Sequence, residues 1–199
     1  MKSLPHRILA MAAQMPEGSV LSADILFSLG TRNALDQALS RLAKTGALMR
    51  VDRGLYVRPI QTRFGERAPD AHKVVTSLAS QAGETMVVGE ASAANSLGLT
   101  TQVPMRPVYL SSGVSRRLQL GNQVVEIRHA PRWKLALANR EAGTALRAMA
   151  WAGKERAQAV ASLLSQRMSE AQLAELTSVS TRYMPAWMSK AIRDLSAHG

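Results

Sequence analysis

The stretch TRNALDQALSRLAKTGALMRVDRGLYV, residues 31–57, decides the fold of the N-terminal part of this 199-residue chain. Its first half has apolar residues at intervals of three, four and seven, which is the pattern of one buried stripe on a helix. These residues are Leu35, Ala38, Leu39 and Leu42. Thr31 is a suitable N-cap and Gly46 a suitable stop, so the sequence predicts a helix between them.

Two short apolar runs follow this helix, at residues 48–51 and 55–58. The turn between them is Asp52-Arg53-Gly54, in which glycine supplies the positive φ of a tight hairpin turn. An arginine at a hairpin tip can enter the minor groove of DNA. The hairpin carries three arginines, of which Arg53 is in the turn and Arg50 and Arg58 are in the two flanking strands.

Two further helices are predicted ahead of residue 31. Residues 3–14 have apolar side chains at helical spacing and stop before Pro16. A second helix is expected over 23–29, with Ser22 as its N-cap. Three helices followed by a basic hairpin are typical of a winged helix-turn-helix, and we expect this module to bind DNA. A winged helix that binds protein or RNA is the alternative.

The outward face of the helix that begins at Thr31 carries polar and charged side chains, which suits a helix lying in a major groove. Arginine makes two hydrogen bonds to guanine, Asn or Gln makes two to adenine, and Ser and Lys reach phosphates. Asp36 either accepts from cytosine or orients Arg32 or Arg41. A solvated polar face is the alternative interpretation. The predicted DNA contacts of helix and wing are Arg32, Asn33, Asp36, Gln37, Ser40, Arg41, Lys44, Arg50 and Arg53.

The chain is strongly basic, with a formal net charge of +11. Residues 1–63 hold nine basic against four acidic residues, 64–130 hold six against five, and 131–199 hold ten against five. Two basic ends therefore flank a nearly neutral middle. A polyanionic partner is the natural inference, because each neutralised phosphate releases counterions. A generally basic proteome is the alternative.

Several function classes find no support in the composition. The absence of cysteine excludes disulfides, thiolate zinc sites and a cysteine nucleophile. No nucleophile elbow or glycine-rich phosphate loop occurs. The four histidines, His6, His72, His129 and His198, lack metal-ligand spacing. We therefore expect no enzyme, catalytic residue, metal or cofactor. No apolar run reaches the roughly 18 residues of a membrane span, so a soluble cytoplasmic protein is expected.

The rest of the chain is predicted to be a second domain over 70–199, separated from the winged helix of residues 1–60 by a linker at 59–69. The linker prediction follows from its Pro, Gly and charge content. The fold class is α+β: a winged helix-turn-helix, then a small mixed α+β domain with a helical C-terminal tail. Arg116 and Arg117 are a possible second contact with DNA or an acidic partner, or else a solvated strand edge.

The elements expected in this second domain alternate before they become helical. A helix is predicted over 70–82, a strand over 86–88, a helix over 91–97 and three strands between 107 and 128. Helices are then predicted over 134–152, 154–167, 169–177 and 183–197.

Four strings of the sequence resemble the AbiEi family of abortive-infection antitoxins, specifically its shorter branch. They are ALSRL at 38–42, RGLY at 53–56, AANSLGLTTQVP at 93–104 and LSSG at 110–113. The third is the most distinctive, because the first two occur in many winged helices. The resemblance covers about residues 5–150.

The resemblance implies a transcriptional autorepressor that binds promoter inverted repeats through its winged helix. It also implies that the C-terminal domain neutralises a nucleotidyltransferase-like toxin without a stable complex, as in a type IV toxin-antitoxin system. An inverted repeat needs two reading heads, supplied by a homodimer or by two monomers. The alternative is a stand-alone winged-helix regulator whose second domain dimerises or senses a ligand.

Overall fold

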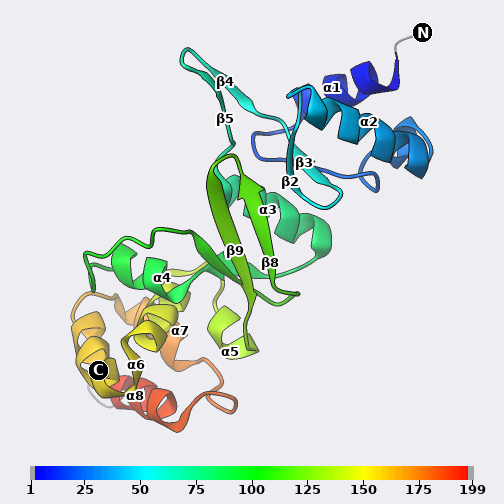
Figure 1. The fold of residues 1–199 in the computed structure, drawn as a ribbon. Coiled ribbons are helices and arrows are strands. Elements are labelled where there is room, and N and C mark those ends of the chain that lie inside the picture. The colour runs from blue at the N-terminus through cyan, green and yellow to red at the C-terminus, as the bar shows by residue number, and fades with distance from the viewer. Residues whose placement is uncertain (1–2, 197–199) are drawn as a thin grey trace. The chain divides into compact units, whose positions relative to one another are not determined.

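The structure is a computed structural model that describes residues 3–196 (Figure 1). It is mixed α+β, as the sequence predicts, and its contacts divide the chain into two compact units. The first unit is Met1–Glu84 with Arg117–Val125, and the second is Thr85–Arg116 with Glu126–Gly199. His198 and the predicted end of the second domain at residue 199 lie outside the described residues.

The helices of the first unit enclose an apolar core. The helices that contribute to it are α1 (Leu4–Gln14), the 3₁₀ helix η1 (Phe27–Leu29) and α2 (Arg32–Lys44). The predicted stripe of α2 is buried at all four positions, and it packs with Ile8, Leu26, Leu48 and Tyr56. Burying each of these large side chains contributes about 1.5–3 kcal/mol. The stripe therefore determines which face of α2 is turned to solvent.

The predicted helix over 23–29 is wrong. Residues 23–26 form turns, and only η1 is helical. Ser22 holds this segment as a single turn, because its Oγ accepts from the Ile25 N–H at 3.4 Å and its carbonyl from the Leu26 N–H at 3.2 Å. These two hydrogen bonds close only one turn, and the backbone is extended at Gly30.

A small antiparallel sheet completes this part of the first unit. Its strands are β1 (Val20–Leu21), β2 (Met49–Asp52) and β3 (Leu55–Val57), in the order β1-β3-β2. Val57 pairs with both Val20 and Met49. The two strands predicted around Asp52-Arg53-Gly54 are therefore confirmed, and Gly54 has the positive φ expected of the turn, 73°.

The segment that we expected to be a linker contains a second hairpin. Its strands are β4 (Ile60–Thr62) and β5 (Gly65–Arg67), paired antiparallel. Five of the six strand residues are exposed and none is buried. The hairpin therefore has no buried face, and it shows none of the alternation of apolar and polar residues that marks a half-buried strand.

The hairpin leads into α3 (Ala71–Ala82), which lies in the first unit rather than in a second domain beginning at residue 70. Asp70 is its N-cap as predicted, and its carboxylate accepts the Lys73 N–H at 3.1 Å.

A four-stranded sheet and a short helix follow α3. Its strands are β6 (Met86–Val88), β7 (Val108–Ser111), β8 (Arg116–Leu120) and β9 (Gln123–His129), and α4 (Glu90–Ser96) follows β6. The strand order is β6-β7-β9-β8, with β6 antiparallel and β9 parallel to β7. These elements confirm the predictions for residues 86–128, although residues 117–125, which comprise nearly all of β8 and the start of β9, group with the first unit.

The tail of the second unit is helical. It contains α5 (Arg132–Leu135), α6 (Glu141–Ser165), α7 (Glu170–Thr177) and α8 (Ala186–Ser196). A continuous helix over 134–152 is wrong, because the backbone turns at Leu137, where φ is 53°. The predicted break before residue 154 is confirmed, since Gly153 is not helical within α6.

One charged side chain lies in the core of this unit. Arg147 of α6 is 1% exposed, and its Nη2 donates to Thr144 Oγ1 at 3.2 Å. Its Nε and Nη1 have no hydrogen-bond partner among the described residues. Burial lowers the pKa of Arg147 to about 10, so the guanidinium is still charged at neutral pH and its lost hydration is not replaced.

We predict that Arg147→Met stabilises the chain. Replacing a poorly compensated buried charge with an apolar side chain of similar volume is expected to raise the free energy of unfolding by about 1–4 kcal/mol. Urea denaturation measures this change. Lys154→Met removes an exposed charge from the same helix and is the matched control, expected to stay within about 0.5 kcal/mol of wild type. A less stable R147M variant would contradict the prediction.

Candidate nucleic-acid interface

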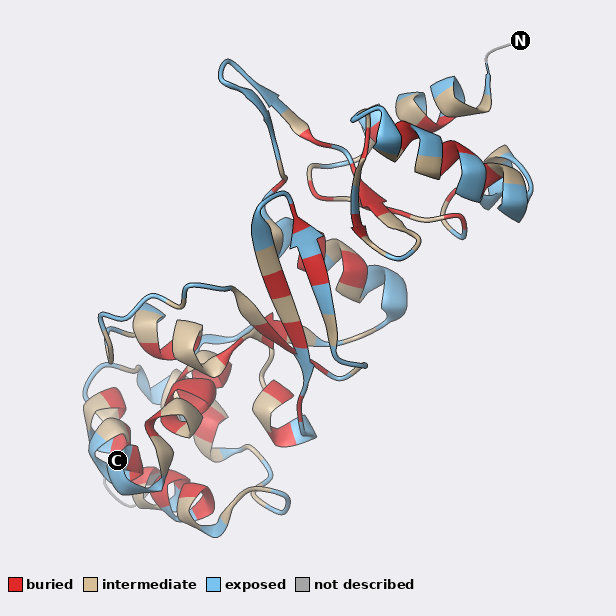
Figure 2. Cartoon of the chain, viewed as in Figure 1, coloured by how far each residue is buried: buried red, intermediate tan, exposed pale blue. Residues whose placement is uncertain are grey.

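The outer face of α2 brings together seven of the predicted site residues (Figure 2). Six are exposed and Ser40 is half-buried. Since the opposite face of α2 is fixed in the core, these side chains cannot rotate away from solvent without unfolding the unit. They are Arg32, Asn33, Asp36, Gln37, Ser40, Arg41 and Lys44.

Ion pairs distinguish the cations on this face. Arg32 Nη1 lies 2.7 Å from Asp24 Oδ1, and its Nε lies 3.2 Å from Asp36 Oδ2. Asp36 therefore orients Arg32, which was one of the two roles considered for it. Exposed pairs of this kind stabilise little, but they hold the guanidinium at the start of α2. Asp24, which is not among the predicted site residues, is the second carboxylate.

The other two cations of α2, Arg41 and Lys44, are exposed. Their side chains make no hydrogen bond or ion pair with another residue in the range 3–196. They are the α2 side chains best able to bind an anion, because no internal partner has to be displaced.

The start of α2 offers backbone donors. Thr31 occupies the N-cap position, but its hydroxyl makes no capping hydrogen bond. The N–H groups of the first helical turn have no partner within the helix. Such groups, together with the helix dipole, favour an anion such as a phosphate.

The β2–β3 hairpin presents one arginine outward. The Asp52 carboxylate accepts the Arg53 N–H at 2.7 Å, which fixes the turn. Arg50 folds back onto it, with Nε donating to the Asp52 carbonyl at 3.3 Å. The Arg53 side chain is exposed and makes no hydrogen bond or ion pair within the described chain. Arg53 is therefore the cation of this tip that has no internal partner to give up.

The β4–β5 hairpin carries two exposed residues that the sequence analysis did not select. Phe64 at its tip is 85% exposed, and the Arg63 guanidinium lies 4.6 Å from the centroid of its ring. Thr62 to Gly65 is a recognisable turn signal, and the aromatic residue inside that turn is the signal that could have pointed to this site.

A glutamate after α1 holds the base of this second hairpin. The Glu17 carboxylate accepts the Asp70 N–H at 3.3 Å and Lys73 Nζ at 2.5 Å, and it lies 3.6 Å from Arg67 Nη2. The hydrogen bond from Lys73 is the main cause of a lowered pKa for Glu17. We call this group of contacts the Glu17 clasp.

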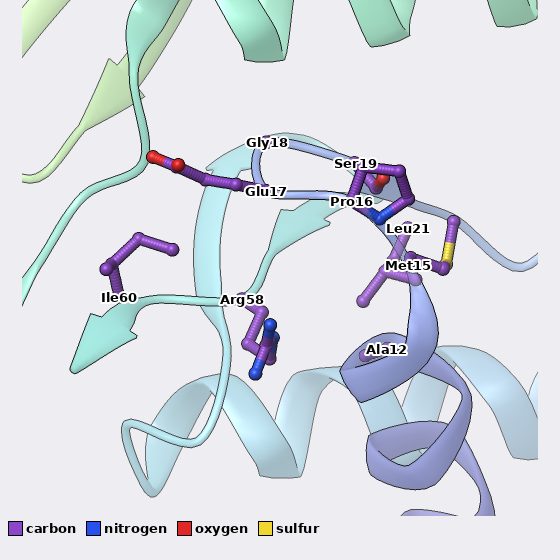
Figure 3. Close-up of a pocket in the computed structure, with 9 residues that line it drawn as sticks. All are labelled: Ala12, Met15, Pro16, Glu17, Gly18, Ser19, Leu21, Arg58 and Ile60. Atoms are coloured by element: carbon purple, nitrogen blue, oxygen red, sulfur yellow. The ribbon is translucent and has the colours of Figure 1, made fainter.

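The hollow beside the clasp is not a ligand site (Figure 3). Figure 3 shows Glu17 and Ile60 on one side of it and Met15 and Pro16 on the other. Its volume of about 10 Å³ admits at most one water. A wider, open hollow of about 620 Å³ along α3 is lined by Glu17 and Lys73, which bind each other, and otherwise mainly by uncharged polar residues.

The remaining predicted residues lie on β8. Arg116 is half-buried and Arg117 is exposed, and both have interaction partners. Within residues 3–196, no three His, Asp or Glu side chains come together as a possible metal site. No helix in that range is long and apolar enough to cross a membrane.

We predict that Gly18→Ala weakens the clasp and destabilises the first unit. Gly18 has φ of +83°, and an added Cβ would lie 2.6 Å from Lys73 Cβ and 2.9 Å from the Lys73 carbonyl carbon. Gly46→Ala is the matched control, because Gly46 has a similar φ of +79° but open space around it. A left-handed alanine costs about 1–2 kcal/mol, so the control shows this cost alone.

Thermal unfolding of the two variants separates the contact from the backbone strain. Because Gly18 packs against Lys73 of α3, we expect a clearly larger fall in Tm for Gly18→Ala than for Gly46→Ala. Equal falls would show that the loop does not pack closely against α3.

A family of unknown function, DUF6088, matches residues 7–172 of the chain. No curated protein and no solved structure matches it significantly.

Proposed function

This chain belongs to the DUF6088 family, and we propose that it is a DNA-binding transcriptional repressor whose N-terminal residues form a winged helix. In this proposal α2 is the recognition helix and the β2–β3 hairpin is the wing. The observation that carries it is the exposed face of α2, where Asn33, Gln37 and Arg41 stand opposite a fully buried stripe.

The dimensions of α2 suit a major groove. Its 13 residues make a rod about 20 Å long, and the groove is about 12 Å wide. Arg41 can pair with guanine, and Asn33 and Gln37 with adenine. Ser40 and Lys44 can reach phosphates, which fix the register of the helix without reading sequence.

The ion pairs of Arg32 give it a different role from Arg41. With Asp24 at 2.7 Å and Asp36 at 3.2 Å, its guanidinium is oriented before any ligand arrives. It can therefore contact the DNA where the N-terminus of α2 enters the groove. Arg41 has no such partners and is free to form new hydrogen bonds with a base. Arg53 at the wing tip supplies the cation for the adjacent minor groove.

We predict that Arg41→Ala weakens binding to a DNA duplex taken from the region upstream of the gene that encodes this chain. The expected loss is roughly 1–3 kcal/mol, the cost of losing a bidentate contact to guanine. Lys44→Ala, which removes a phosphate contact, should instead reduce the slope of log K against log salt by about one. Fluorescence anisotropy measures both.

Arg193→Ala is the matched control, since it removes an exposed arginine from a helix of the second unit. It should bind like wild type. If Arg41→Ala and Arg193→Ala had the same affinity, α2 would not be the reading element.

For the second unit we propose an antitoxin role, supported by the resemblance of residues 93–104 to AbiEi antitoxins. This segment comprises the end of α4 and the loop after it. Asn95 Nδ2 donates to the Thr100 carbonyl at 3.1 Å and to the Gln102 carbonyl at 3.2 Å. Asn95 thereby holds the loop in which Val103 is 75% and Met105 99% exposed, an apolar surface suited to a protein partner.

In this role the chain represses its own operon and counteracts a nucleotidyltransferase-like toxin without a stable complex. Both actions take place in the cytoplasm. The alternative is a stand-alone winged-helix regulator, whose gene has no nucleotidyltransferase beside it.

We predict that co-expression of the chain rescues cells from a neighbouring nucleotidyltransferase, and that Asn95→Ala reduces the rescue while leaving DNA binding intact. Growth after induction of the toxin is the readout. Asn122→Ala, at a turn between β8 and β9, is the control. Undiminished toxicity with the wild-type chain would leave only the stand-alone regulator.

A further inference from the structure

The β4–β5 hairpin is an unusual structure for a surface segment with no buried face. Two-stranded hairpins are marginally stable alone, yet this one is tied at three levels. Gln61 and Glu66 are hydrogen-bonded across the strands. At the tip, Thr62 Oγ1 donates to the Gly65 carbonyl at 2.7 Å and accepts the Phe64 N–H at 3.2 Å. At the base, the Glu17 clasp holds Arg67.

The ordered tip presents an aromatic ring to solvent. The chain has two phenylalanines, and Phe64 is 85% exposed. Leaving such a side chain in water forgoes about 1.5–3 kcal/mol of burial. An isolated exposed residue alone means little, but here the Arg63 guanidinium stacks on the ring. The tip is thus a flat apolar surface beside a positive charge.

The charges of the hairpin favour an anionic partner. The carboxylate of Glu66 is engaged by Gln61, and Arg67 is engaged by Glu17. Arg63 makes no ion pair among the described residues, and neither does the exposed Arg58 at the foot of the hairpin. Residues 58–67 hold three arginines against one glutamate, so the hairpin has a net charge of +2.

The chain itself limits how far this tip lies from the proposed wing. Arg63 follows Arg53 by ten positions, so their Cα atoms are at most about 36 Å apart. One turn of B-DNA is about 34–36 Å. Both tips can therefore contact one duplex within about one helical turn.

We infer that the β4–β5 hairpin is a second DNA-contacting wing, in which Phe64 wedges against a base step and Arg63 binds the minor groove beside it. Apolar side chains inserted at a base step unstack and bend the duplex, and a narrow minor groove attracts arginine. This inference rests on the proposed function. It adds that the binding site extends beyond the base pairs read by α2 and that the bound DNA is bent.

The test measures affinity and bending on two duplexes from the chain's upstream region, a long one and one trimmed by about a helical turn on each flank. Fluorescence anisotropy gives affinity, and energy transfer between dyes at the duplex ends gives bending. The double variant Arg63→Ala/Phe64→Ala should bind the long duplex about tenfold or more weakly than wild type. It should also bend the duplex less, and it should lose little further affinity when the flanks are removed.

Two variants sharpen this test. Phe64→Leu keeps an apolar wedge and should retain bending. Arg182→Ala/Tyr183→Ala removes an exposed arginine-aromatic pair from the second unit, with 5.4 Å between guanidinium and ring centroid, and should behave as wild type.

The outcomes separate the two proposals. If the wild-type chain bound neither duplex, the proposed function would fail, and this inference with it. If the wild type bound while Arg63→Ala/Phe64→Ala matched it in affinity and bending, only the second wing would be overturned. A change of oligomeric state in that variant, measured by light scattering, would also overturn it, because the hairpin would then join copies of this chain.

Discussion

The apolar stripe of α2 packs against α1 and against the segments that precede and follow it, and most features of the first unit depend on this burial. Leu35 and Leu39 are completely buried beside Ile8 and Leu26. With that face fixed, the polar side chains of α2 can only face solvent. The chain has few aromatics, so aliphatic packing carries this constraint almost alone. Because one face of α2 is fixed in the core, the side chains on its outer face keep constant positions relative to one another. The helix can therefore serve as a rigid support for recognition.

A second constraint acts through charge. Three carboxylates near the proposed interface each pair with a cation: Asp24 and Asp36 with Arg32, and Glu17 with Lys73. The described cations without a carboxylate partner include Arg41 and Lys44 on α2 and Arg53 and Arg63 at two hairpin tips. This division distinguishes the side chains that build the unit from those able to bind a polyanion. In the second unit, Arg147 is the contrasting case of a cation enclosed without compensation.

The spacing of apolar residues in the sequence predicted the elements that bury one face in the core. The spacing of Leu35, Leu39 and Leu42 gave α2 and its solvent face, and the turn at Gly54 gave the strands around it. The β4–β5 hairpin was missed because it buries no face and leaves no apolar pattern. The pair between Asp24 and Arg32 spans eight residues across η1, and its proximity depends on a turn that the sequence alone suggested was a helix. The resemblance of residues 93–104 pointed to a partner that spacing could not have indicated.

The central claim is that this chain binds DNA through the face of α2. DNase footprinting of the full chain on its own upstream region, repeated over a range of salt concentrations, tests it most directly. The account predicts a discrete protected stretch with inverted-repeat symmetry and an affinity that falls linearly in log K against log salt. Absence of any protected stretch at low salt would contradict it.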